Sequence, residues 1–148
     1  MANFTNDSDL EQYEPDIKNY GIQDFSDLHV LSTADIKREI EIEWWPRANY
    51  GRYDLSAGTT TSFEDSLLVS SQWTRAAVFH VLGFYVYPRL STFDPNGDVF
   101  REKMAYYRQE YRNEFDKILR LGVKYDFDSS GTITTSEKKP THFNRLVR

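Results

Sequence analysis

The stretch DPNGDVFREKMAYYRQEYRNEFDKILRLG, residues 94–122, carries the clearest structural signal in the chain. Asp94-Pro95 supplies a helix cap and a first-turn proline, and Asp98 suits the positive N-terminal pole of a helix. An apolar and aromatic stripe at helical spacing is formed by Phe100, Met104, Tyr107, Tyr111, Phe115, Ile118 and Leu119. Gly122 fits the residue that follows a helix. The stretch therefore predicts a long amphipathic helix that ends at Gly122.

A second long helix is predicted nearer the N-terminus. It runs from about Asp24 or Ser26 to Trp45, where Pro46 ends it. Its apolar residues recur at three- to five-residue spacing and are Leu28, Leu31, Ile36, Ile40 and Trp44. A shorter helical segment is expected between Asp9 and Lys18, before Tyr20-Gly21 ends it.

A third long helix is predicted between these two, with Ser62 or Ser66 as its N-cap. It contains AAVFHVLGFYVYPRL, residues 76–90, which is apolar nearly all round, as in a helix that is buried on several sides. Pro88 marks its end or a kink. The predicted fold class is therefore mainly α, a small helical bundle of three long helices plus a short N-terminal one.

The pattern changes after the last helix. Residues 123–128 alternate apolar and charged side chains, Ser129-Ser130-Gly131 is a turn sequence, and residues 132–135 favour a strand. We therefore expect a C-terminal β-hairpin. The final stretch KKPTHFNRLVR, residues 138–148, has few apolar residues and is expected to be an extended arm.

Two parts are predicted along the chain. Residues 1–122 form the helical bundle, with a mobile N-terminus over the first eight residues and a long loop at residues 46–62 that is rich in Gly, Ser and Thr. Residues 123–148 form the hairpin and the extended arm.

Composition is that of a globular protein. Hydrophobic residues at 39% and charged residues at 28% are typical of this class, and no apolar run approaches the roughly 20 residues that a bilayer span needs. The chain has no cysteine, which excludes disulfides, thiolate zinc sites and cysteine nucleophiles. The N-terminus lacks the basic start and apolar stretch of a secretory signal, so we expect folding in a cytoplasm.

The net charge of −5 is unevenly distributed. Residues 123–148 carry five Lys/Arg and three Asp/Glu, a net +2, which leaves −7 for residues 1–122. Because affinity for phosphate comes mainly from Lys and Arg, an acidic body is not expected to grip nucleic acid.

The segment DFDSSGTITTSE, residues 126–137, satisfies the twelve-position calcium loop of EF-hand proteins. The predicted ligands are Asp126, Asp128, Ser130, Thr132 through its carbonyl, Thr134 through a water molecule, and Glu137 in bidentate mode. Two features argue against a complete EF-hand. Gly122 ends the preceding helix before the loop begins, and Pro140 stands where the exiting helix should begin. A tight Asp/Ser/Gly turn needs no metal, so a calcium site and a plain turn both stand as interpretations.

No catalytic motif is present in the sequence, and we predict a protein that is not an enzyme. The three histidines His29, His80 and His142 have no partners at ligand spacing and are expected to be ordinary core or surface residues. The carboxylates Glu39, Glu41 and Glu43 are interpreted as a solvated helix face rather than a general acid/base pair.

The adjacent tryptophans Trp44 and Trp45 cannot both enter one core face, because neighbouring helix positions diverge by about 100°. One ring is expected to face a second surface. That surface is either a loop of the same chain or a neighbouring subunit.

Three segments together resemble the head-to-tail adaptor, or head-completion, proteins of tailed bacteriophages. They are DLHVLSTADIKREIEIEWW at 27–45, SSQWTRAAVFHVLGFYVYPRLS at 70–91, and DVFREKMAYYRQEYRNEFDKILRLGVKYDFDSSG at 98–131. The resemblance lies in helix layout and aromatic-rich helices and covers roughly residues 9–130.

The resemblance implies a virion protein, assembled in the host cytoplasm, that forms a twelve-membered ring beneath the portal protein. DNA would pass through the lumen without specific binding. From the residues themselves we expect no membrane association and no cofactor, apart from the possible calcium ion. The resemblance further implies a C-terminal arm that docks on the portal, for which the residues here are Lys138, Lys139, Phe143, Arg145, Leu146 and Arg148. The surface toward the stopper or tail would include Arg47, Tyr50, Arg52 and Tyr53.

Two other functions are carried forward. One is a calcium-binding regulatory module that acts through the loop at 126–137, and the other is a tail-completion or stopper protein of the same virion. The stopper interpretation differs from the adaptor only in its neighbours.

Overall fold

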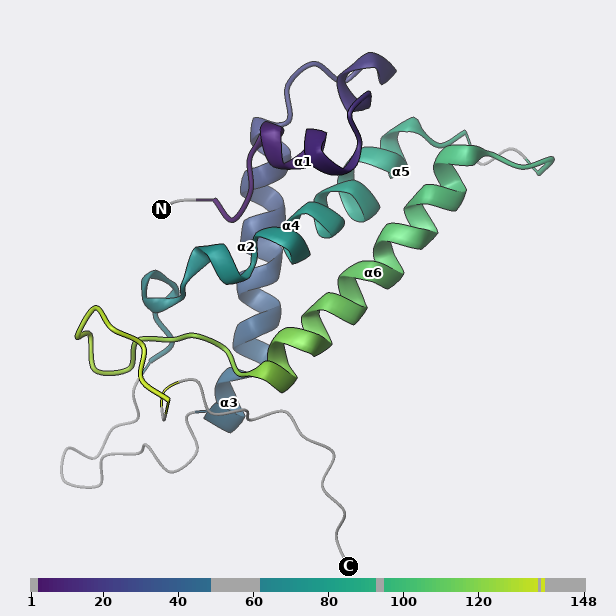
Figure 1. Ribbon diagram of the computed structural model, residues 1–148. Coiled ribbons are helices and arrows are strands. Elements are labelled where there is room, and N and C mark those ends of the chain that lie inside the picture. The colour runs from purple at the N-terminus through teal and green to yellow at the C-terminus, as the bar shows by residue number, and fades with distance from the viewer. Residues whose placement is uncertain (1–2, 49–61, 93–94, 136, 138–148) are drawn as a thin grey trace, which may run out of the picture.

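The computed structural model describes residues 3–48, 62–92, 95–135 and 137, and these residues form a helical bundle (Figure 1). The helices are α1 (Asp7–Tyr13), α2 (Ser26–Glu43), α3 (Trp45–Ala48), α4 (Thr74–Val81), α5 (Tyr87–Leu90) and α6 (Val99–Leu121). A π-helical segment, η4 (Leu82–Val86), joins α4 to α5, and three 3-10 turns are η1 (Ile17–Tyr20), η2 (Asp65–Leu67) and η3 (Ser70–Gln72). The prediction of a mainly α fold is confirmed.

α4 is the centre of the bundle, with α2 on one side and α6 on the other (Figure 1). Every side chain from Ala76 to Leu82 is buried. The sequence prediction of a helix covered on several sides is therefore confirmed for this segment.

α6 is the longest helix and follows its predicted stripe. Its buried side chains are Tyr107, Tyr111, Phe115, Ile118 and Leu119. Asp98, rather than Asp94-Pro95, is the N-cap, because its carboxylate accepts the N–H of Phe100 at 2.9 Å. Gly122 ends the helix with a φ of +108°, a backbone conformation that favours glycine.

α2 ends at Glu43, but Pro46 does not stop the helical path as predicted. α3 follows after Trp44, and the N–H of Ala48 donates to the carbonyl of Trp44 at 3.0 Å. Proline is tolerated here because the first-turn N–H groups of a helix have no intrahelical acceptor. The first residues of the predicted loop, 46–48, are therefore helical, and residues 49–61 lie outside the described ranges.

The third predicted helix begins at Thr74, later than the predicted Ser62 or Ser66. Leu68 instead forms an antiparallel bridge with Tyr125. The carbonyl of Leu67 accepts the N–H of Asp126 at 3.1 Å, and the N–H of Val69 donates to Lys124 at 3.2 Å. These main-chain groups are used between segments and cannot also form a helical ladder.

The same bridge explains why the predicted C-terminal hairpin is not found in the described residues. Tyr125 pairs with Leu68 instead of with residues 132–135, and no strand is formed in the part of the chain that is described. Val123 and Tyr125 are both buried in the helical core. Residues on both sides of residue 122 therefore contribute to the hydrophobic core.

The N-terminal segment, predicted to be mobile, is buried against the bundle at Phe4 and Thr5. Phe4 is only 4% exposed and stacks on Trp73 at 6.3 Å between ring centroids. Its N–H donates to Thr33 Oγ1 at 3.1 Å, and its carbonyl accepts from Thr74 Oγ1 at 2.9 Å. An apolar side chain in a polar stretch thus anchors the segment between α2 and α4.

Trp44 and Trp45 are both buried in one aromatic cluster with Phe63, Tyr125 and Phe127. Trp44 lies 5.5 Å from Tyr125, and Trp45 stacks on Phe127 at 6.0 Å. The second surface for the tryptophan pair is therefore supplied by loops of the same chain. This cluster also holds the segment that follows α6 against the end of α2.

Candidate functional site

The loop that follows α6 is closed by its own carboxylates. Asp126 accepts the N–H of Ser130 at 3.0 Å and that of Gly131 at 2.8 Å through its two oxygens. Asp128 also accepts from Ser130 N–H, at 3.1 Å. Hydrogen bonds from Ser130 are the main reason that the pKa of Asp128 is lowered, because they stabilise the charged carboxylate.

Glu137 completes the loop from its far end. It is 7% exposed, and it accepts the N–H of Asp128 at 3.3 Å and the N–H of Thr134 at 2.8 Å. Carboxylate oxygens of Asp126, Asp128 and Glu137 lie within 4.8 Å of one another. Three carboxylates at this spacing are hard oxygen donors of the kind that calcium prefers.

The other predicted ligands are placed less favourably for a metal. Ser130 Oγ donates to the carbonyl of Thr132 at 3.1 Å, and the Thr134 hydroxyl donates to Glu137 at 2.9 Å. A bound calcium ion would have to replace these contacts. The loop thus brings together the three carboxylates among its six predicted ligands, each of which already accepts hydrogen bonds from the loop, and uses the other three residues to hold its own shape.

The two histidines that the structure describes are core residues, as predicted. His29 Nε2 lies 2.9 Å from Asp7 Oδ1 and joins α1 to α2. His80 Nδ1 lies 2.9 Å from Ser32 Oγ, between α4 and α2. Burial lowers the pKa of His80 to about 4, so its ring is neutral at pH 7. His142 lies outside the described residues.

Glu39 is not part of a solvated face, which corrects the sequence interpretation for this residue. Its Oε2 accepts the hydroxyl of Tyr111 at 2.5 Å, and Arg112 lies 3.7 Å from its other oxygen. Glu41 and Glu43 are exposed, as predicted. Glu39 therefore links α2 to α6 instead of pairing with a second carboxylate.

Comparison with protein families, with characterised proteins and with solved structures gives no match. The function must therefore be inferred from the chain's own surfaces. No helix in the described ranges is long and apolar enough to cross a membrane.

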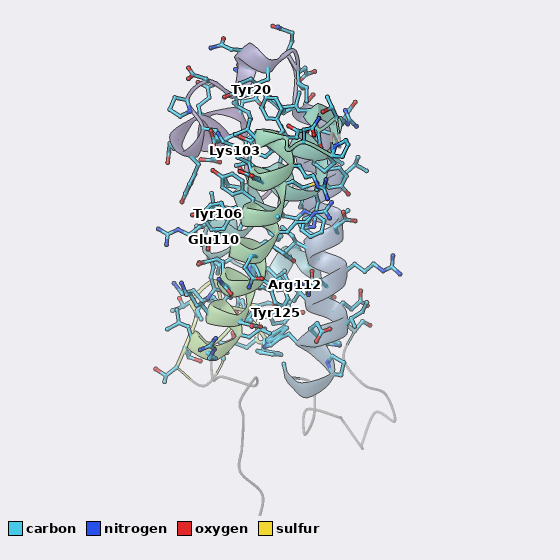
Figure 2. The ribbon with its side chains drawn as sticks, turned by 90° about the vertical axis from the view of Figure 1, so that its right-hand side faces the viewer. Tyr20, Lys103, Tyr106, Glu110, Arg112 and Tyr125 are labelled. Carbon is cyan, nitrogen blue, oxygen red and sulfur yellow. The ribbon has the colours of Figure 1, made fainter. Side chains whose placement is uncertain are left out.

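Large hydrophobic side chains are exposed on the two helices that flank α4. On α2 they are Val30, Leu31 and Ile42, and on α6 they are Val99, Tyr106 and Leu121. Leu31 was predicted to belong to the core stripe, but it is 46% exposed. Figure 2 shows Tyr106 at the edge of α6 away from α2, and Arg112 on the side that faces α2.

A groove of about 690 Å³ runs beside α2 and was not predicted. α2 contributes Val30, Ala34 and Glu41 to its wall, and the opposite wall includes Phe63 and Glu64. Val30 and Ala34 are apolar residues of α2 that lie off the core stripe, and they are the only sequence signal for this groove among its lining residues on α2. The other wall comes from a segment whose position depends on the tertiary fold.

The predicted contact residues at the chain's C-terminus and in the long loop cannot be placed. Lys138, Lys139, Phe143, Arg145, Leu146 and Arg148 lie outside the described residues, as do Tyr50, Arg52 and Tyr53. Arg47 belongs to α3, and its side chain is likewise outside the description.

Proposed function

We propose that this protein is a structural adaptor subunit of a phage head-to-tail connector. It forms a ring under the portal, joins head to tail, and lets DNA pass through the lumen. The observation that carries the proposal is the exposure of large hydrophobic side chains on both α2 and α6, the two helices that pack against the central helix α4. Exposed aromatic side chains such as that of Tyr106 are of the kind that is enriched where protein surfaces meet.

The placement of the reactive side chains supports a role without chemistry. His29 and His80 are buried with one polar partner each, and Glu39 is held by Tyr111. These groups stabilise the packing of α1, α4 and α6 against α2. Substrate turnover by the purified protein would contradict the proposal.

The charge of the chain suits a channel through which DNA slides. A net charge of −5 disfavours tight binding of phosphate, which suits DNA that has to slide. Four of the five Lys/Arg among residues 123–148 lie in the arm at residues 138–148 that we propose binds the portal. Charge thus supports both the passage of DNA and attachment at the chain's end.

Electron microscopy of the purified protein, alone and mixed with a candidate portal, tests this function. We expect closed rings that bind to one face of the portal. Removal of residues 138–148 should abolish portal binding while the thermal unfolding temperature changes little, because the described core contains none of these residues. Truncated protein that unfolds, or full-length protein that neither forms rings nor binds the portal, would contradict the adaptor role.

A calcium-binding regulatory module is the second candidate function. The observation that favours it is the approach of carboxylate oxygens from Asp126, Asp128 and Glu137 to within 4.8 Å.

A tail-completion or stopper role is supported by the same exposed hydrophobic side chains as the adaptor role. The portal-binding experiment separates these two virion roles, because a stopper binds the ring and the tail but not the portal.

A further inference from the structure

The outer side of α2 carries a row of exposed residues at helical spacing. We define the α2 stripe as Leu31, Asp35, Arg38 and Ile42, which are separated by four, three and four positions and are all exposed. At about 100° per residue, these four side chains leave the helix within about 60° of one another. Ile36 and Ile40, which enter the core, lie on the opposite side of the helix. The stripe therefore faces away from the bundle.

The two ends of the stripe are apolar. Leu31 is 46% exposed and Ile42 is 60% exposed, although leucine and isoleucine are among the residues most often fully buried. α2 runs along one edge of the bundle (Figure 2). A second helix could therefore lie along the stripe and cover both side chains.

The two middle residues of the stripe have opposite charges. Arg38 forms no hydrogen bond or ion pair with another residue in the described ranges. Asp35 accepts the hydroxyl of Tyr85 through Oδ2, and its Oδ1 accepts no hydrogen bond from the described part of the chain. One cation and one carboxylate oxygen are thus available to a partner.

The spacing of the stripe reads the same in both directions along the helix. When two stripes meet with the helices antiparallel, Leu31 of each copy faces Ile42 of the other, and Asp35 faces Arg38. In a parallel pair each residue faces its own equivalent, so that carboxylate meets carboxylate and cation meets cation. Because opposed like charges disfavour a contact, the stripe selects the antiparallel arrangement.

The charges beside the stripe are compatible with this register. In an antiparallel pair centred between residues 36 and 37, Glu41 comes beside Ala34 of the other copy, and Asp27 comes level with Pro46. Glu39 is bonded to α6 of its own copy through a tyrosine hydroxyl and an arginine. Within this register no carboxylate of the stripe's flanks is placed directly opposite its equivalent.

We propose that two copies of the protein pair through their α2 stripes about a two-fold axis, with the two helices antiparallel. Such a contact is isologous, because the same surface is used by both copies, and it closes at two subunits. One helix face is a small contact, so we expect the dimer to dissociate on dilution.

The pair goes beyond the proposed function and does not rest on it. A ring beneath a portal needs all of its copies to point the same way, whereas a two-fold contact turns one copy upside down. The pair is therefore a state of the free protein that competes with the ring, and it leaves the exposed side chains of α6 uncovered.

Cysteine cross-linking tests the register, because the chain has no cysteine of its own. Leu31→Cys and Ile42→Cys are oxidised separately and as an equal mixture. The mixture should give at least about tenfold more cross-linked dimer than either variant alone, because two copies of residue 31 lie about 16 Å apart along antiparallel helices and a disulfide needs Cα atoms within about 7 Å. Leu121→Cys replaces Ile42→Cys in the control mixture and should give no such increase, since it lies on α6.

Charge reversal tests the complementarity by sedimentation velocity over a series of protein concentrations. Asp35→Arg gives a stripe with two cations, and Arg38→Asp gives a stripe with two carboxylates. Each variant alone should associate at least about tenfold more weakly than wild type, and an equal mixture should associate again. Loss of the Tyr85 hydrogen bond alone would weaken the mixture as well. Asp116→Arg and Arg101→Asp, at exposed positions of α6, are matched controls and should behave as wild type does.

Cross-linking that depends on mixing, together with recovery of the mixed charge variants, supports the pair. Cross-linking of Leu31→Cys alone as strong as that of the mixture, or no cross-link in the mixture, would overturn it. Far-UV circular dichroism should show that every variant is folded. Because these assays contain no portal, the pair can be disproved while the ring stands, and failure of portal binding leaves the pair unaffected.

Discussion

Arg108 Nε donates a hydrogen bond of 2.9 Å to the main-chain carbonyl oxygen of Gly83. The π-helical segment explains why this carbonyl is available: Tyr87 N–H donates to Leu82, five positions earlier, and Pro88 has no N–H to donate to Gly83. The absence of a Cβ at Gly83 lets α6 approach, since a Cβ would lie 2.9 Å from the main-chain nitrogen of Arg108. A proline on one helix is thus compensated by an arginine on another.

Arg108→Met should lower the free energy of unfolding by about 1–3 kcal/mol, because it leaves the Gly83 carbonyl without a donor. Urea unfolding measures the change. Arg101→Met, on the same helix and exposed, is the control and should change stability by less than about 0.5 kcal/mol. In a Pro88→Ala background the Arg108→Met cost should shrink, since the alanine supplies a main-chain N–H that proline lacks; equal costs in both backgrounds would disprove the compensation.

His80 should make the fold sensitive to acid between about pH 6.5 and pH 4. Burial lowers its folded-state pKa to about 4, although the carboxylate of Asp35 opposes the shift, so in this window the unfolded chain binds a proton that the folded chain does not. The free energy of unfolding should therefore fall as pH falls, by about 3 kcal/mol across the window at about 1.36 kcal/mol per pH unit.

His80→Gln isolates this contribution, because glutamine does not titrate. The difference in unfolding free energy between wild type and variant, measured at pH 7 and pH 4, should be larger at pH 7. A constant difference would mean that His80 does not carry the acid sensitivity.

Phe4→Ala should destabilise the protein by about 3–5 kcal/mol, although Phe4 stands in a polar N-terminal stretch. The side chain is buried on Trp73, and its removal leaves a cavity between α2 and α4. Thermal or urea unfolding gives the value. Tyr13→Ala, at a side chain that is 37% exposed, serves as the comparison, and a loss no larger than that of Tyr13→Ala would mean that the N-terminal anchor is not part of the core.

Calorimetric titration with calcium decides the second candidate function. If the loop is a calcium site, wild type should bind with an affinity of about 0.1–10 μM, as sensor loops do, and Glu137→Gln should abolish the binding heat. Asp116→Asn, at an exposed residue of α6, should bind as wild type does. Without binding heat in wild type, the carboxylates only close a turn.

Local patterns predicted the helices more successfully than their ends or connections. The stripe from Phe100 to Leu119 and the all-round apolar segment at residues 76–90 identify α6 and α4, because amphipathic spacing is set by the helix itself. Twelve positions of loop pattern also predicted that Asp126, Asp128 and Glu137 converge. Whether that loop binds an ion depends on whether the ion can displace the main-chain N–H groups from the three carboxylates. The sequence pattern does not specify those hydrogen bonds.

The sequence by itself determined the helical class, the central buried helix and the cap at Gly122, since these follow from residues that are neighbours along the chain. Only the tertiary structure decided that Leu68 pairs with Tyr125, that Phe4 is an anchor and that Ile42 and Leu121 remain exposed. Each of those outcomes depends on which distant segment competes for the same main-chain groups or apolar surface. Such competition is settled by the packed fold as a whole and has no signature in a short stretch of sequence.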